Sequence, residues 1–137
     1  MVEKIARFMR ANDKVAVWLN IDVLSAKIGY AKMGMTIRAD MLNAADICQG
    51  GALFSFADFA FAVASNSRGT LALATSADIH FTNPAFLGDR LIAEAQELQR
   101  TKRTGFYQIT VTRESDGKLI ALFSGNVFVK EERIKAG

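Results

Sequence analysis

One acidic residue, Asp58, lies in the middle of a segment that is otherwise almost entirely apolar. The segment runs from residue 50 to residue 66 and reads GGALFSFADFAFAVASN. An ionised carboxylate in such surroundings costs several kcal/mol unless something compensates it. Asp58 is therefore either a structural residue, hydrogen-bonded to backbone or to a partner chain, or a catalytic carboxylate with a shifted pKa.

The residues Gln49-Gly50-Gly51 open the same segment. The first turn of a helix has free backbone N–H groups and the positive end of the helix dipole, so it attracts negative charge. Two glycines also let a ligand carbonyl approach the main chain closely, although glycine pairs are common in ordinary tight turns. The sequence thus offers a candidate oxyanion hole at the start of a helix.

Gly50 and Asp58 cannot both reach one carbonyl from the same chain. They are eight residues apart, which corresponds to roughly 12 Å at 1.5 Å per residue along a helix. If both groups act on one substrate carbonyl, they must come from different subunits across a two-fold interface. We therefore expect catalysis to require a dimer.

Cys48 and His80, the only residues of their types, are weaker candidates. Cys48 could be a nucleophile, but no base is evident near it, and buried free cysteines usually behave as small hydrophobic residues. His80 falls on a predicted strand face and is more readily explained as a structural or pocket-wall residue. One histidine and one cysteine do not make a zinc site, so we expect no metal.

The turn Arg100-Thr101-Lys102-Arg103-Thr104-Gly105 concentrates three positive charges. It could hold the phosphates of a nucleotide-bearing substrate, or it could be a solvated basic turn. Asn43, upstream of the helix, has no independent signal beyond its polarity.

The composition indicates one globular domain, which we expect to span residues 1–137. Half of the residues are apolar, and 17 Lys and Arg against 14 Asp and Glu give a net charge of +3, too weak a bias to argue for nucleic acid. The single cysteine excludes an intramolecular disulfide, no run approaches the roughly 20 apolar residues of a membrane span, and the N-terminus has no secretion signal. We expect a cytoplasmic protein with neither a membrane nor a nucleic-acid partner.

The pattern of apolar residues predicts an α+β fold in which a strongly curved antiparallel sheet surrounds one helix. Helices are expected at about residues 2–12, followed by a turn, and at about residues 50–66, the second helix buried on all sides and capped by a left-handed Gly69. Two strands between residues 21 and 41 should break near Gly29 or Gly34, and further strands are expected at 71–81, 89–98, 105–113 and 118–129. Asp116-Gly117 is a hairpin signal. Five or six strands with short connections require no parallel crossover.

Several motifs together closely resemble the phenylacetate-degradation (PaaI-type) hotdog thioesterases. The resemblance spans about residues 21–129 and rests on Asn43, Gln49-Gly50-Gly51, Ala57-Asp58, Asn66-Ser67-Arg68-Gly69, Pro84, Gly88-Asp89 and Arg103-Thr104-Gly105. It implies a hotdog fold, hydrolysis of aryl- or short- to medium-chain acyl-CoA, and homodimers that assemble into homotetramers. It implies no cofactor apart from the coenzyme A of the substrate.

The resemblance also implies roles for individual residues. Asp58 matches the catalytic acid, acting as general base or nucleophile, Gly50 matches the glycine whose N–H polarises the thioester carbonyl, and Asn43 matches a polar residue that places carbonyl or water. Many relatives have histidine where this chain has Gln49, which leaves the amide donor but removes an imidazole, so altered specificity is expected rather than loss of activity. Gly51 would help to bind the substrate.

The coenzyme A would lie along the dimer interface. Its phosphates would bind near Lys102, Arg103 and Thr104, and its pantetheine arm would run beside Ser76 and Asp78. Burial should raise the pKa of Asp58 toward neutrality, opposed by the partner's helix end. Two alternatives remain: a hotdog hydratase or dehydratase, which would usually need a catalytic histidine, and a non-catalytic acyl-CoA-binding or interaction module, for which Gln49 is the only hint.

Overall fold

The computed structural model of the protein describes residues 1–135. Its centre is one six-stranded sheet in which all paired neighbours are antiparallel, in the order β1-β2-β4-β5-β6-β3. The strands are β1 (Asp22–Lys27), β2 (Tyr30–Thr36), β3 (Thr70–Phe81), β4 (Arg90–Arg100), β5 (Thr104–Arg113) and β6 (Leu119–Arg133). The predicted number of strands and their antiparallel arrangement are confirmed.

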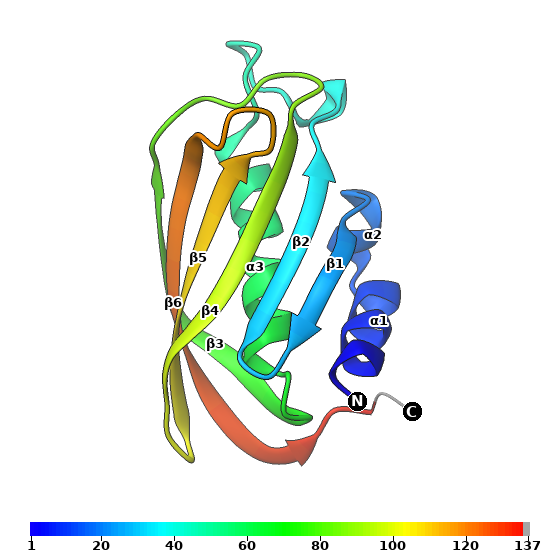
Figure 1. Ribbon diagram of the computed structural model, residues 1–137, viewed down its shortest axis with the longest axis vertical. Helices are drawn as coiled ribbons and strands as arrows, with labels where there is room; N and C mark the ends of the chain where they lie inside the picture. Colours follow the sequence, from blue (N-terminus) through cyan, green and yellow to red (C-terminus); the bar gives the residue numbers. More distant parts are fainter. Residues whose placement is uncertain (136–137) are drawn as a thin grey trace.

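The long helix α3 (Gly50–Ser65) lies inside the curve of this sheet, as Figure 1 shows. Its apolar side chains pack against the inner sheet face, where Phe61 lies between Tyr107 and Phe123 with ring centroids 5.6 and 5.5 Å away. The helix begins at Gly50, as predicted, and ends at Ser65 instead of residue 66. A curved antiparallel sheet wrapped around one long helix is the hotdog fold, so this prediction is confirmed.

The expectation that α3 is buried on all sides is wrong for the single chain. One stripe of the helix keeps partial or full exposure, formed by Gly51, Ser55, Asp58 and Ala62. These residues are spaced four, three and four apart, so they lie on one face. The sheet covers the other faces, and no element within residues 1–135 fully covers this stripe.

The N-terminal segment forms two helices rather than a helix and a turn. Helix α1 (Val2–Asn12) has the predicted bounds, and it is followed by the short α2 (Lys14–Trp18). Asp13 begins α2 as its N-cap, since its carboxylate accepts a hydrogen bond from the Ala16 amide at 3.0 Å, a geometry that favours helix initiation. A short 3-10 helix, η1 (Ala39–Met41), follows β2.

The turn between β1 and β2 falls at Gly29, one of the two predicted breaks. Gly29 has φ +71, a left-handed conformation that favours glycine. Gly34 instead lies inside β2, where the guanidinium of Arg90 occupies the space that a side chain would need. Gly69 and Gly117 have φ +85 and +72, as the predicted cap and hairpin require.

An ion pair fixes the C-terminal end of α3 to the sheet. Both guanidinium nitrogens of Arg68 donate to the Glu97 carboxylate, and the buried Tyr107 hydroxyl donates to the same carboxylate at 2.7 Å.

Among residues 1–135, no helix is both long and apolar enough to cross a membrane.

Candidate active site

The start of α3 presents two unpaired backbone amides. The amides of Ala52 and Leu53 donate to the carbonyl of Gln49 at 3.0 and 3.3 Å, whereas those of Gly50 and Gly51 have no hydrogen-bond acceptor within residues 1–135. Unpaired N–H groups at a helix start attract an anion or a polarised carbonyl oxygen. The geometry therefore provides the two donors that an oxyanion hole needs.

Asn43 organises the loop that leads into this helix. Its side-chain oxygen accepts hydrogen bonds from the amides of Ala45 and Ile47 at 2.9 and 3.3 Å. The backbone pair between Leu42 and Cys48 closes the loop. The side-chain NH2 group of Asn43 makes no hydrogen bond in the described part of the chain, so it remains available as a donor.

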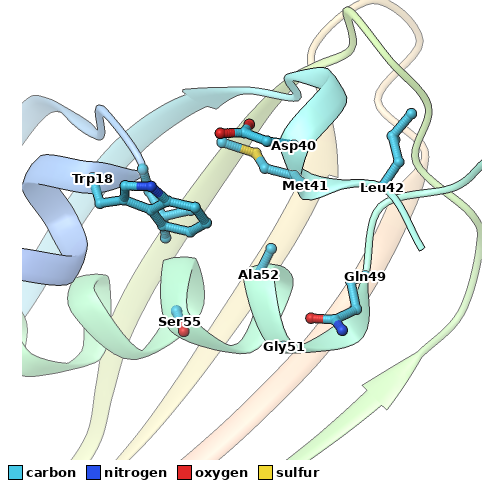
Figure 2. Close-up of a pocket in the computed structure, with 9 residues that line it drawn as sticks. Trp18, Asp40, Met41, Leu42, Gln49, Gly51, Ala52 and Ser55 are labelled. Carbon is cyan, nitrogen blue, oxygen red and sulfur yellow. The ribbon is translucent and has the colours of Figure 1, made fainter.

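Two cavities flank the first turn of α3. The first, here called the Gly50 cavity, has a volume of about 530 Å³, contains Gly50 and Asn43 in its lining, and is bordered by Phe81 and Thr82 at the end of β3. The second, here called the Trp18 cavity, has a volume of about 370 Å³ and lies between Gly51, Ser55, Met41 and Trp18 (Figure 2). The two free amides thus lie between two spaces large enough for parts of a ligand.

Asp58 lies on the exposed stripe of α3, about two turns from the helix start. Its side chain makes no hydrogen bond and no salt bridge within residues 1–135. Burial raises the pKa of Asp58 above its ordinary value, and the negative charge of Asp13 adds to the effect. A carboxylate that is partly desolvated and unpaired is a better proton acceptor than a fully solvated one.

The helix keeps Gly50 and Asp58 apart, as the spacing predicts. Both lie on the continuous helix α3, which separates their backbones by roughly 12 Å. The free amides and the unpaired carboxylate of one chain therefore cannot act on the same atom.

Gly51 lies at the helix start, whereas the other predicted substrate-binding residues fall into two groups that the single chain does not bring there. Ser76 and Asp78 are exposed on β3, where the Ser76 hydroxyl accepts a hydrogen bond from Asn126 at 3.0 Å. The turn that joins β4 and β5 carries Lys102 and Arg103, and Thr104 follows as the first residue of β5. This turn lies at the opposite end of the molecule from the start of α3 (Figure 1).

The basic turn borders a cavity of about 280 Å³. Its cationic side chains come from the turn, from the end of β4 and from β6. Arg103 also forms a salt bridge of 3.4 Å with Glu131. This arrangement suits a phosphate chemically, but it is remote from Gly50 of the same chain.

The other sequence candidates have ordinary surroundings. Cys48 is buried, burial raises its pKa to about 11, and a thiol with such a pKa is a poor nucleophile at neutral pH. His80 is exposed on β3, with its Nε2 3.5 Å from Asp78. The described residues contain no group of three or more His, Cys, Asp or Glu side chains that could hold a metal ion.

Three features of the site have no signal in the sequence. Phe81 covers Gly50 so closely that an added Cβ there would lie 2.9 Å from the ring. Trp18 lines a cavity with residues more than 20 positions away, and Asp13 lies close enough to raise the pKa of Asp58. These contacts join segments that only the tertiary fold brings together, although an isolated tryptophan after a helix could have been noted as a candidate.

A hotdog sheet whose helix starts with two free amides and carries an unpaired carboxylate is an arrangement suited to a thioester-hydrolysing enzyme. The sequence model of the thioesterase superfamily matches residues 46–120. The acyl-coenzyme A thioesterase PaaI of Escherichia coli is 45% identical over 120 residues, which cover 88% of this chain and 85% of that protein.

Solved structures of PaaI proteins are also similar to this chain. The structure of the Escherichia coli PaaI protein from the phenylacetic acid degradation operon has a TM-score of 0.94 and 41% identity, covering 98% of this chain and 96% of its own. A mutant of PaaI from Thermus thermophilus has a TM-score of 0.77 and 39% identity, covering 89% and 97%. The chain belongs to the thioesterase superfamily and, within it, to the PaaI-type hotdog thioesterases.

Proposed function

We propose that this protein hydrolyses the thioester of an aryl- or short- to medium-chain acyl-CoA at sites shared between two subunits. The Gly50 amide of one subunit, aided by Gly51, binds the thioester oxygen, and Asp58 of the partner provides the carboxylate. The two groups have opposite electrostatic preferences, both lack a partner within the described chain, and one helix holds them roughly 12 Å apart. The proposal rests on this observation: within one chain, the amides and the carboxylate each lack a partner and are too far apart to meet.

The free edge of the sheet supports a dimer. Strand β3 is twelve residues long and pairs only with β6, so its other edge has unpaired backbone groups. Such an edge readily pairs with a second chain. A two-fold axis beside β3 sets the two α3 helices antiparallel, so that the start of one approaches the middle of the other. Two such dimers would form the homotetramer.

In this site the free amides stabilise the charge that develops on the thioester oxygen. Water attacks with Asp58 as general base, or Asp58 attacks first and water then hydrolyses the resulting anhydride. Both routes consume one water and release a carboxylic acid and free coenzyme A. The side-chain NH2 group of Asn43 supplies a further hydrogen-bond donor beside the carbonyl. Gln49 stands where many relatives have a histidine, so its side-chain amide replaces an imidazole at that position.

The coenzyme A arm is placed along β3, beside Ser76 and Asp78, and it reaches the thioester through the Gly50 cavity, which lies at the end of that strand. The basic turn of Lys102, Arg103 and Thr104 is the candidate for the phosphates. Because this turn is distant from Gly50 in one chain, it would serve a site that includes the α3 start of another subunit.

Release of free thiol from phenylacetyl-CoA, hexanoyl-CoA and acetyl-CoA tests the proposal, with wild type compared with Asp58→Asn. We expect thiol release by wild type and a loss of at least 100-fold in the variant, as is typical for a general base. Unchanged release by Asp58→Asn would exclude Asp58 from the reaction. Binding without release would indicate a non-catalytic module. In a parallel assay with an enoyl-CoA, loss of the enoyl absorbance without release of thiol would indicate a hydratase.

A further inference from the structure

The Trp18 cavity has an unusual wall. Trp18 is 56% exposed, whereas the adjacent Leu19 is 1% exposed and packs in the core. In Figure 2 the indole of Trp18 and the side chain of Met41 lie above the first turns of α3, and Gln49 comes from the other end of the cavity. A large aromatic side chain is thus left open to a space that also reaches the Gly51 end of the helix.

Arg38 holds this aromatic wall in place. Its guanidinium lies 5.5 Å from the Trp18 ring, donates to the Trp18 carbonyl at 2.8 Å, and donates to the Asp40 carboxylate at 3.1 Å. The stacked cation fixes the indole. The same ion pair offsets the charge of Asp40, which also lines the cavity. The wall is therefore preorganised before any ligand binds.

The position of the two cavities matches the two sides of a thioester. Gly50 lines one cavity and Gly51 lines the other. A carbonyl oxygen bound between their amides leaves the carbonyl carbon with two substituents, the sulfur and the acyl carbon, which diverge to opposite sides. With the coenzyme A arm entering along β3 through the Gly50 cavity, the acyl group is left to face the Trp18 cavity.

We propose that Trp18 is a specificity-determining residue that binds the acyl group of the substrate and favours an aromatic ring over a linear chain. This inference rests on the proposed function, which supplies the position of the thioester oxygen and the route of the coenzyme A arm. The cavity of about 370 Å³ exceeds the volume of about 150 Å³ that suffices to bind benzene in an apolar protein cavity. The exposed indole makes favourable directional contacts with aromatic rings.

The only tryptophan of the chain makes the inference measurable without turnover. Asp58→Asn would be titrated with phenylacetyl-CoA, acetyl-CoA and coenzyme A, with indole emission followed and binding measured independently by calorimetry. We expect a saturable change in emission with phenylacetyl-CoA and little change with the other two. Equal emission changes for all three, or calorimetric binding of phenylacetyl-CoA without an emission change, would overturn the inference.

A substitution series then tests selectivity in the otherwise unchanged enzyme. We expect Trp18→Ala to lower kcat/KM for phenylacetyl-CoA about 3- to 10-fold more than for acetyl-CoA, the range of one aromatic pair. Trp18→Phe should retain most of the preference. Val17→Ala is the matched control, since Val17 is similarly exposed on α2 but does not line the cavity.

The outcomes separate the two proposals. An active enzyme whose ratio of kcat/KM values is the same in wild type and Trp18→Ala would refute the role of Trp18 and leave the proposed function intact. A wild type that releases no thiol from any ester would refute the proposed function. In that case the emission titration still decides whether the aromatic ring reaches Trp18.

Discussion

The proposed oxyanion donor can be removed from the backbone itself by Gly50→Pro. Gly50 is the first residue of α3, and proline is well tolerated at that position because its φ suits the helix and its missing N–H has no intrahelical acceptor. The preceding residue, Gln49, has φ −65 and ψ 140, the extended conformation required before proline. The variant should therefore fold while lacking one hydrogen-bond donor.

The expected cost follows from that one donor. Removing an oxyanion-hole donor typically lowers kcat about 100- to 1000-fold, or about 2.7–4 kcal/mol. Gly50→Ala is the matched control, because its Cβ crowds Phe81 as the proline ring would, at 2.9 Å from the Cζ atom, but it keeps the N–H. We expect Gly50→Ala to lose far less activity than Gly50→Pro.

Mixing inactive variants then tests whether the site is shared. Neither Gly50→Pro nor Asp58→Asn homodimers have an intact site. A heterodimer of the two has one intact site, with the amide from the Asp58→Asn chain and the carboxylate from the Gly50→Pro chain. Random pairing at equal amounts makes about half of the dimers heterodimers, so about a quarter of wild-type activity should return.

The control is the same mixture before subunit exchange, which should stay inactive. Full activity of Gly50→Pro would refute the role of this amide. If native mass spectrometry detected heterodimers and the mixture still remained inactive, the inference that the two groups meet across an interface would be refuted.

Three further predictions concern protonation and packing. Because burial raises the pKa of Asp58, ionisation of this carboxyl group opposes folding as the pH rises. Asp58→Asn should therefore raise Tm at about pH 8 but not at about pH 3, where the carboxyl is protonated in both the folded and the unfolded state. A scan of Tm against pH tests this prediction, and an equal shift of Tm at both pH values would contradict it. Glu97→Gln weakens the ion pair with Arg68 and should cost about 1–3 kcal/mol in urea unfolding, with kcat unchanged because the pair lies at the other end of α3. Gly125→Ala places a Cβ 2.7 Å from the Phe61 ring and should destabilise by about 1–3 kcal/mol, whereas an unchanged urea midpoint would show that the ring can move.

The elements that depend on local periodicity could be predicted from the sequence. The limits of α3 and β3 follow from a change between a helical apolar segment and strict alternation, and the Gly29 turn follows from glycine. Gly34 could not be distinguished from Gly29 by sequence, because its small size serves Arg90, a residue from another strand. The short helix α2 was missed because it depends on one capping contact of Asp13.

The site could be predicted only where one segment carries it. Gly50 and Asp58 could be singled out as candidates because they share a helix, and their separation follows from helix geometry alone. The Trp18 cavity requires α2, η1 and α3 to meet, and no sequence periodicity encodes that meeting. For the same reason the apolar pattern predicted α3 to be buried on every side: it shows which residues avoid water but not which chain covers them.

In the proposed dimer, the exposed stripe of α3 would link catalysis to assembly. A single chain leaves two groups unsatisfied on one helix, the helix-start amides of Gly50 and Gly51 and the carboxylate of Asp58. The amides need a negatively charged partner and the carboxylate needs a positively polarised one, since an anion is stabilised near a helix N-terminus. The antiparallel helix of a second subunit would bring a carboxylate to each helix start, with a thioester bound between the two groups. Substrate binding should therefore also strengthen the dimer, because a ligand held by both subunits stabilises their association.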